Sequence, residues 1–104
     1  QAFVDSNDWT QISSAKKSAT TDTASVIIDT MYNSDKEVAD NYTKLIVRLG
    51  ETGKQSAEKT ITKGKTYDLN ITDKYKAKGQ TLWLYAKGNN PKLDCYVDGT
   101  FNAN

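Results

Sequence analysis

Apolar residues recur at every second position over several short runs of the chain, and polar clusters separate these runs. The clearest run covers residues 43–49, where Leu45, Val47 and Leu49 alternate with mostly polar residues. Because successive side chains of a β-strand point to opposite faces, this spacing predicts a strand with one buried face. The two glycines within residues 50–53 predict that a turn follows it.

Similar patterns predict most of the remaining strands. The run at residues 25–32 is apolar on both faces, which is typical of a central strand. Residues 55–62 mix helix-favouring and strand-favouring types, and Ser34 with Glu37 fits a capping box that predicts a loop or one short turn at residues 35–40. The other expected strands are residues 66–72, 82–87 and 93–101, with residues 9–15 as a weaker candidate.

Two of these runs lie on either side of the segment Gly88-Asn89-Asn90-Pro91. Proline lacks a backbone N–H, and asparagine and glycine adopt turn dihedral angles readily, so this segment should end a strand. Leu93, Cys95 and Val97 resume the alternation after it. The pattern therefore predicts a β-hairpin with a short loop.

Short strands joined by polar turns at nearly regular spacing define the expected fold class. We predict an all-β protein, a small antiparallel β-sandwich of six to seven short strands, Ig-like or jelly-roll-like, without βαβ units. A chain of 104 residues supports one core, so residues 1–104 should form a single domain. Residues 1–8 are expected to be a loosely ordered N-terminal segment.

Composition removes several classes of chemistry. The sequence has no histidine, the usual base for serine or cysteine nucleophiles and a common metal ligand, and Cys95 is its only thiol. We therefore expect no catalytic, cofactor-binding or metal-binding residues. Cys95 alternates in the same phase as Leu93 and Val97, which predicts a buried thiol. The alternative is an exposed thiol that forms an intermolecular disulfide. The net charge of +1 is much smaller than the positive charge that is typical of a nucleic-acid-binding protein.

The aromatic residues near the predicted hairpin are the candidate binding surface. Trp83 and Tyr85 lie on the face opposite Leu82 and Leu84, and Tyr96 should face outward on the next strand. With the lysines beside them they would form a platform for a sugar ring or a protein partner. The alternative is that Trp83 fills the core. The candidate surface comprises Trp83, Tyr85, Tyr96, Lys87 and Lys92.

A resemblance to known proteins rests on Leu84–Pro91 and Val97–Phe101, where a short β-rich segment ends on Gly-Thr-Phe. These residues resemble the ends of small secreted Gram-positive proteins of unknown function, which are grouped loosely with lactococcin-like bacteriocins. The resemblance implies export and an antagonistic or cell-envelope role. It carries no functional residues to this sequence.

We therefore expect a secreted, non-enzymatic module that binds an extracellular protein or glycan at or outside the cell surface. The chain opens on Gln1-Ala2-Phe3 without an initiator methionine, as expected of a mature exported form. No apolar run approaches the roughly 20 residues that span a bilayer, while Lys74, Lys76 and Lys78 around Tyr75 suit weak association with the envelope. The alternatives are a bacteriocin-like toxin or its immunity factor, and a small hydrolase that uses two carboxylates.

Overall fold

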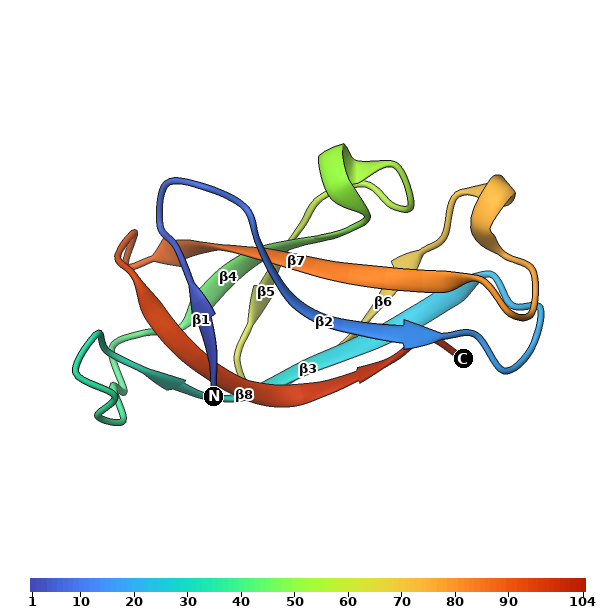
Figure 1. The fold of residues 1–104 in the computed structure, drawn as a ribbon. Coiled ribbons are helices and arrows are strands. Elements are labelled where there is room, and N and C mark those ends of the chain that lie inside the picture. Colours follow the sequence, from blue (N-terminus) through green and yellow to red (C-terminus); the bar gives the residue numbers. More distant parts are fainter.

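The computed structural model describes residues 1–104 and consists of β-strands and two single 3-10 turns (Figure 1). It contains eight strands where six to seven were predicted. The turns are η1 (Glu51–Gly53), between β4 and β5, and η2 (Asp73–Tyr75), between β6 and β7. The strands are β1 (Ala2–Val4), β2 (Thr10–Lys16), β3 (Thr23–Tyr32), β4 (Lys44–Leu49), β5 (Lys59–Thr62), β6 (Thr66–Asn70), β7 (Thr81–Asn90) and β8 (Cys95–Asn102).

Strand pairing joins β1 to β8, β2 to β7, β3 to β6 and β4 to β5, and each pair is antiparallel. Two further pairs, β3 with β8 and β4 with β7, complete the sheets. We call β1-β8-β3-β6 the β8 sheet and β2-β7-β4-β5 the β7 sheet. The chain is thus one long antiparallel hairpin wound into two sheets, which is the jelly-roll arrangement. The predicted all-β sandwich is confirmed, and of its two variants the jelly roll is the one present.

The core lies between the two sheets and takes the alternate residues of each strand. Leu45, Val47 and Leu49 of β4 are buried, as their spacing predicted. On β7, Leu82 and Leu84 are buried in the same way. All buried hydrophobic residues belong to one cluster, to which both sheets contribute.

The predicted hairpin of residues 82–87 and 93–101 is wrong. β7 pairs with β2 and β4, whereas β8 pairs with β1 and β3, so these two strands lie in different sheets although they are consecutive in sequence. Leu93, expected in the buried phase, is 53% exposed because it lies in the connection that crosses between the sheets. Alternation reports which residues share a face, but it carries no information about which strand pairs with which.

The prediction that residues 1–8 are loosely ordered is wrong for Ala2–Val4, which form β1. Ala2, Phe3 and Val4 pair with Val97, Tyr96 and Cys95 respectively, and the Val4 side chain is fully buried. A strand of three residues is too short to show periodicity, so alternation cannot predict it.

Residues 35–40 and 55–62, whose structure the pattern leaves open, are mostly loop. Within residues 55–62, only Lys59–Thr62 is a strand. Gln55 and Ser56, the first two residues of that range, are buried in the loop before the strand. Residues 35–40 form a turn and loop, with an isolated bridge between Tyr32 and Val38. The weak candidate near residue 9 is β2.

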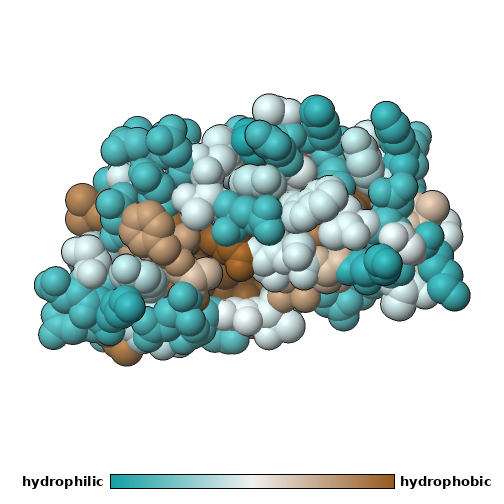
Figure 2. All heavy atoms as spheres, in the orientation of Figure 1, coloured by the Kyte–Doolittle hydropathy of each residue, from teal (hydrophilic) through white to brown (hydrophobic).

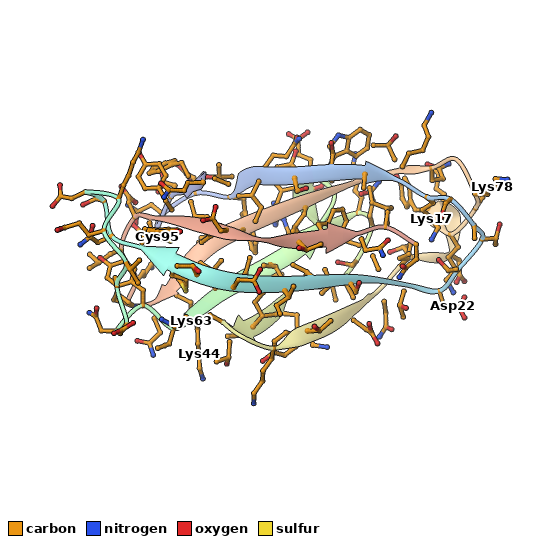
Figure 3. All side chains as sticks on the ribbon, turned by 90° about the horizontal axis from the view of Figure 1, so that it is seen from below. Lys17, Asp22, Lys44, Lys63, Lys78 and Cys95 are labelled. Atoms are coloured by element: carbon orange, nitrogen blue, oxygen red, sulfur yellow. The ribbon has the colours of Figure 1, made fainter.

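Lys17 is buried, although the alternation of apolar residues does not predict a buried lysine at this position. Its Nζ donates hydrogen bonds to the backbone oxygens of Ala103 and Asn104, each at 3.2 Å, and to the hydroxyl of Thr21. Burial lowers the pKa of this lysine, against the opposing charge of Asp22. Lys17 and Asp22 lie at one end of the sandwich, far from Cys95 (Figure 3). The ammonium group therefore connects Ala103 and Asn104 to the loop after β2.

Cys95 is buried, with 1% of its surface exposed, which confirms the predicted buried thiol. Burial, and to a smaller extent the charge of Asp94, raises the pKa of this thiol from an ordinary 9.0 to about 11. A sulfur in this position cannot reach a second molecule without local unfolding.

The raised pKa of Cys95 predicts a pH dependence of stability. The unfolded chain loses the thiol proton first, so the stabilisation is complete below about pH 9 and is lost as the pH rises through about 11. Between these values the native protein should lose roughly 2–3 kcal/mol more stability than a Cys95→Ala variant. Urea unfolding of both proteins at a series of pH values measures the difference, and parallel losses would contradict the prediction.

Candidate functional site

The outer face of the β7 sheet carries three of the predicted surface residues. Trp83, Tyr85 and Lys87 alternate with the buried Leu82, Leu84 and Ala86 on β7, so they point away from the core. Trp83 is 40% exposed, and Tyr85 and Lys87 are half-buried. The alternative that Trp83 fills the core is therefore wrong.

Trp83 and Tyr85 line a hollow of about 300 Å³ that we call the aromatic groove. A third ring, Tyr75, enters it from η2. The rest of the lining is Gln11 from β2 and Gly50, Glu51, Lys54 and Gln55 from the loop between β4 and β5. Residues from four separate parts of the chain, β2, the loop between β4 and β5, η2 and β7, thus line one hollow.

Gln55 holds the parts of the aromatic groove together. Its side-chain Nε2 donates to the carbonyl of Thr81 at 3.0 Å, and its Oε1 accepts from the backbone N–H of Trp83 at 3.1 Å. Its backbone N–H donates to Leu49 at 3.1 Å, and its carbonyl accepts from Thr72 at 2.8 Å. One buried residue therefore connects the end of β4, the loop that carries Tyr75, and the strand that carries Trp83.

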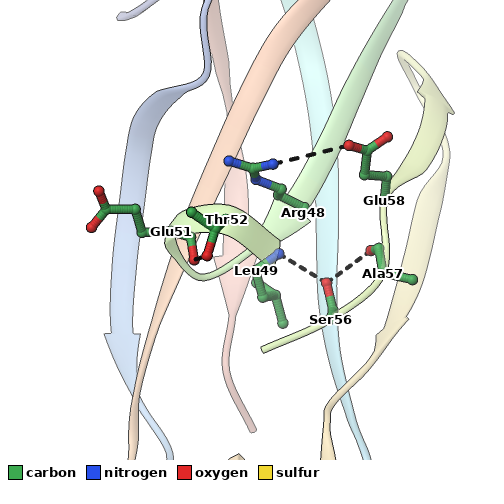
Figure 4. Close-up of polar contacts among 7 residues, drawn as sticks. All are labelled: Arg48, Leu49, Glu51, Thr52, Ser56, Ala57 and Glu58. Atoms are coloured by element: carbon green, nitrogen blue, oxygen red, sulfur yellow. Dashed lines mark hydrogen bonds and ion pairs between the residues drawn. The ribbon is translucent and has the colours of Figure 1, made fainter. Parts of the chain in front are cut away.

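The loop that contains Gln55 turns sharply at Gly50. Gly50 has a φ of 80°, and a Cβ there would lie 2.8 Å from the Gln55 Cγ. Ser56 closes the loop, because its hydroxyl accepts from the Leu49 N–H at 2.8 Å and donates to the Ala57 carbonyl at 3.0 Å (Figure 4). The wall of the groove is thus fixed from both ends.

Ion pairs hold the η2 segment that presents Tyr75. The Lys76 Nζ lies 2.7 Å from Asp73 and 3.3 Å from Asp22. The hydrogen bond to Lys76 lowers the pKa of Asp73, and the hydrogen bonds to Asp73 and Asp22 raise the pKa of Lys76. This arrangement joins η2 to the loop between β2 and β3.

Trp9 lies further along the same face and is held between two cations. The Arg48 guanidinium carbon is 4.0 Å from the centre of the Trp9 ring system, and the Lys87 Nζ is 5.5 Å from it. Arg48 also contacts Glu58 at 4.0 Å (Figure 4). Lys87 is therefore part of a cation–aromatic stack next to the groove, and it does not line the groove itself.

The remaining two predicted surface residues lie elsewhere. Tyr96 is on the outer face of the β8 sheet, where its ring meets Phe3 edge-on at 5.5 Å and the Lys36 Nζ at 5.0 Å. Lys92 lies in the connection between β7 and β8. The prediction of one platform from both strands is corrected, because it assumed that β7 and β8 pair.

Sequence reasoning missed the contribution of Tyr75, Gln55 and Trp9 to this face. In the sequence, Tyr75 stands out only by its neighbouring lysines, and Gln55 belongs to a segment that mixes helix-favouring and strand-favouring residues. A glutamine in a glycine-containing turn beside a buried strand gives a weak signal at most, since its partners are distant in sequence.

No protein-family model, curated protein or solved structure matches this chain. The structure also lacks any helix with the length and hydrophobicity needed to cross a bilayer. What bears on function is the chemistry of the aromatic groove, where three aromatic rings and a few hydrogen-bonding side chains surround one hollow.

Proposed function

We propose that this protein is a secreted, non-enzymatic recognition module that binds a glycan in the aromatic groove. The observation that carries the proposal is the exposed Trp83 ring in a concave site with Tyr85 and Tyr75. Aromatic rings offer a large apolar surface at a low cost in conformational entropy, and a sugar ring presents C–H faces that pack on it.

Polar side chains of the groove suit the hydroxyl groups of a sugar. Gln11 offers an amide that donates and accepts, Glu51 accepts, and Lys54 donates. Gln55 contributes little here, because β7 already engages its side-chain amide. A ligand that is apolar on its faces and polar around its edge matches this distribution.

The shape of the groove favours a glycan over a protein partner. Its volume of about 300 Å³ is at the lower end for small-molecule sites, which suits one or two sugar rings. A stable protein partner would need roughly 800 Å² of surface on each side. Glu51 is also the one carboxylate that lines the groove, whereas glycosidic hydrolysis ordinarily uses two.

Trp83→Ala should reduce glycan affinity by at least about tenfold, because it removes the most exposed ring of the groove. An array of immobilised bacterial and host oligosaccharides selects the probe, and calorimetry with that probe measures the affinity. Phe3→Ala is the matched control, since Phe3 is 41% exposed but lies on the other sheet.

Equal affinity of the native protein and Trp83→Ala would refute the groove as the glycan site. If no oligosaccharide binds and the purified protein releases dye from vesicles that contain anionic lipid, the toxin alternative replaces the proposal. Circular dichroism should show both variants to be folded, since neither side chain belongs to the buried core.

A further inference from the structure

Charged side chains are divided unequally between the two sheets. The strands of the β7 sheet contain five cationic residues and no carboxylate, whereas those of the β8 sheet contain three carboxylates and no lysine or arginine. The cationic residues are Lys16, Lys44, Arg48, Lys59 and Lys87, and the carboxylates are Asp29, Asp68 and Asp98. The net charge of +1 for the whole chain therefore conceals a basic sheet, and this sheet carries the aromatic groove.

Two of these cations adjoin the aromatic groove. Arg48 pairs with Tyr85 across β4 and β7, and Lys87 follows Tyr85 by two residues on the same face of β7. Side chains opposite each other on neighbouring strands lie roughly 5 Å apart at Cβ, and residues two positions apart in a strand lie roughly 7 Å apart. A sugar chain that packs on Trp83 and Tyr85 would therefore pass directly beside both cations.

The guanidinium of Arg48 has no hydrogen-bond acceptor within the protein. Its Nε is buried without a partner, and its Nη1 lies 4.0 Å from the exposed Glu58, which is too far for a hydrogen bond. The Arg48 side chain is only 14% exposed. Figure 4 shows one end of the guanidinium directed at Glu58 and the opposite end directed toward β7. A cation that is largely withdrawn from water and lacks a hydrogen-bonded carboxylate attracts a nearby anion strongly.

Trp9 and Gly53 fix the position of this cation. The centre of the Trp9 ring system lies 4.0 Å from the Arg48 guanidinium carbon and 5.5 Å from the Lys87 Nζ, so both charges are gathered around one ring. Gly53 of η1 lies beside the stem of Arg48, since a Cβ at Gly53 would be 3.6 Å from the Arg48 Cδ. The guanidinium is thus held in place without a ligand, which lowers the entropy cost of binding one.

We propose that the glycan of the aromatic groove is anionic and that Arg48 and Lys87 bind its negatively charged group, an inference that rests on the glycan-binding function proposed above. A planar guanidinium and an ammonium group both donate hydrogen bonds to the oxygens of a carboxylate, a sulfate or a phosphate. The charged group belongs to the sugar beside Tyr85, because Arg48 and Lys87 flank Tyr85.

The surroundings of the groove favour an acidic glycan over a strand of nucleic acid. η1 and η2 rise above β7 in Figure 1, and hydrophilic residues predominate along this side of the molecule in Figure 2, which suits a ligand rich in hydroxyl groups. Glu51 lines the groove and Glu58 lies beside Arg48, so a backbone with a phosphate at every unit would meet two carboxylates. A glycan can place one acidic group beside Arg48 and turn neutral hydroxyl groups toward Glu51.

The test extends the oligosaccharide array with acidic members, each printed beside its neutral form. Uronic acids are paired with their carboxyl-reduced forms, and sulfated or phosphorylated sugars with forms that lack these groups. In calorimetry at low salt, the tightest acidic member should bind at least about tenfold more tightly than its neutral form. Added salt should reduce this difference, because it screens the attraction between charges. The identity of that member distinguishes a carboxylate from a sulfate or a phosphate.

Arg48→Gln should weaken binding of the acidic member by at least about tenfold, and Lys87→Gln by at least about threefold, so that both affinities approach that of the neutral form. Lys44→Gln is the matched control, because it removes one positive charge from an exposed site of the same sheet. Lys44 pairs with Asn90, away from the groove, and its variant should bind like the native protein.

Equal affinity for the acidic and neutral forms, or native affinity of both variants for the acidic member, would overturn the inference and leave the groove as a site for neutral glycans. Tighter binding of single-stranded DNA than of every acidic member would also overturn it and assign the basic sheet to nucleic acid. If Arg48→Gln does not fold, Lys87→Gln decides the question. If no member of the array binds, the proposed function fails together with the inference.

Discussion

Gly99→Ala is expected to destabilise the protein by about 3 kcal/mol or more. A Cβ at Gly99 would lie 2.1 Å from the backbone oxygen of Ile27 and 3.0 Å from the Cα of Ile28. Neither atom belongs to a flexible side chain, so the two central strands of the β8 sheet would have to separate. The cause is local, because β3 bulges at Asp29 between the pairs Ile28–Gly99 and Thr30–Asp98.

Urea unfolding of Gly99→Ala and Thr100→Ala measures this cost. Thr100 is the next residue of the same strand and is exposed, so its truncation tests the loss of a side chain without the clash. We expect the midpoint of Thr100→Ala to stay close to that of the native protein. Similar midpoints for Gly99→Ala and the native protein would show that β3 and β8 can separate at little cost.

Several elements could be predicted because their determinants are local. The alternation at residues 43–49 and 82–87 identified β4 and β7, and the burial of Leu45, Val47, Leu82 and Leu84 follows from it. The spacing of Trp83 and Tyr85 likewise placed both on one face. Each of these inferences depends only on residues two positions apart in one strand.

Pairing between strands could not be predicted in this way, and the errors follow from that. Alternation alone predicts Tyr96 on the face of Trp83 only if β7 and β8 form a hairpin, but each strand has its partners elsewhere. The need for glycine at position 99 has the same origin, since the atoms that exclude a Cβ belong to a strand about 70 residues earlier. The aromatic groove also depends on distant pairing, because Tyr75 and Gln55 reach it only once β4 and β7 lie side by side.

Gln55→Ala should destabilise the protein by about 2–3 kcal/mol and also weaken glycan binding. The substitution removes both side-chain hydrogen bonds to β7 and leaves the Thr81 carbonyl and the Trp83 N–H without these partners. The loops that carry Glu51 and Tyr75 then lose their common connection. Lys54→Ala, next to it but exposed, should change glycan affinity with little effect on the urea midpoint.

Gln55→Glu changes the hydrogen bonds of this residue but keeps its volume, so it tests the hydrogen bonds alone. A carboxylate can still accept from the Trp83 N–H, but it faces the Thr81 carbonyl without a proton to donate, so its pKa should rise above the ordinary value for glutamate. A raised carboxyl pKa gives stability that is present at low pH and is lost as the pH increases through it. The stability deficit of Gln55→Glu should therefore be largest near neutral pH and shrink towards about pH 4. Urea midpoints of the variant and the native protein at both pH values measure this change. A stability deficit that does not depend on pH would contradict the prediction. It would mean that in the variant a water molecule donates to the Thr81 carbonyl in place of the Gln55 amide.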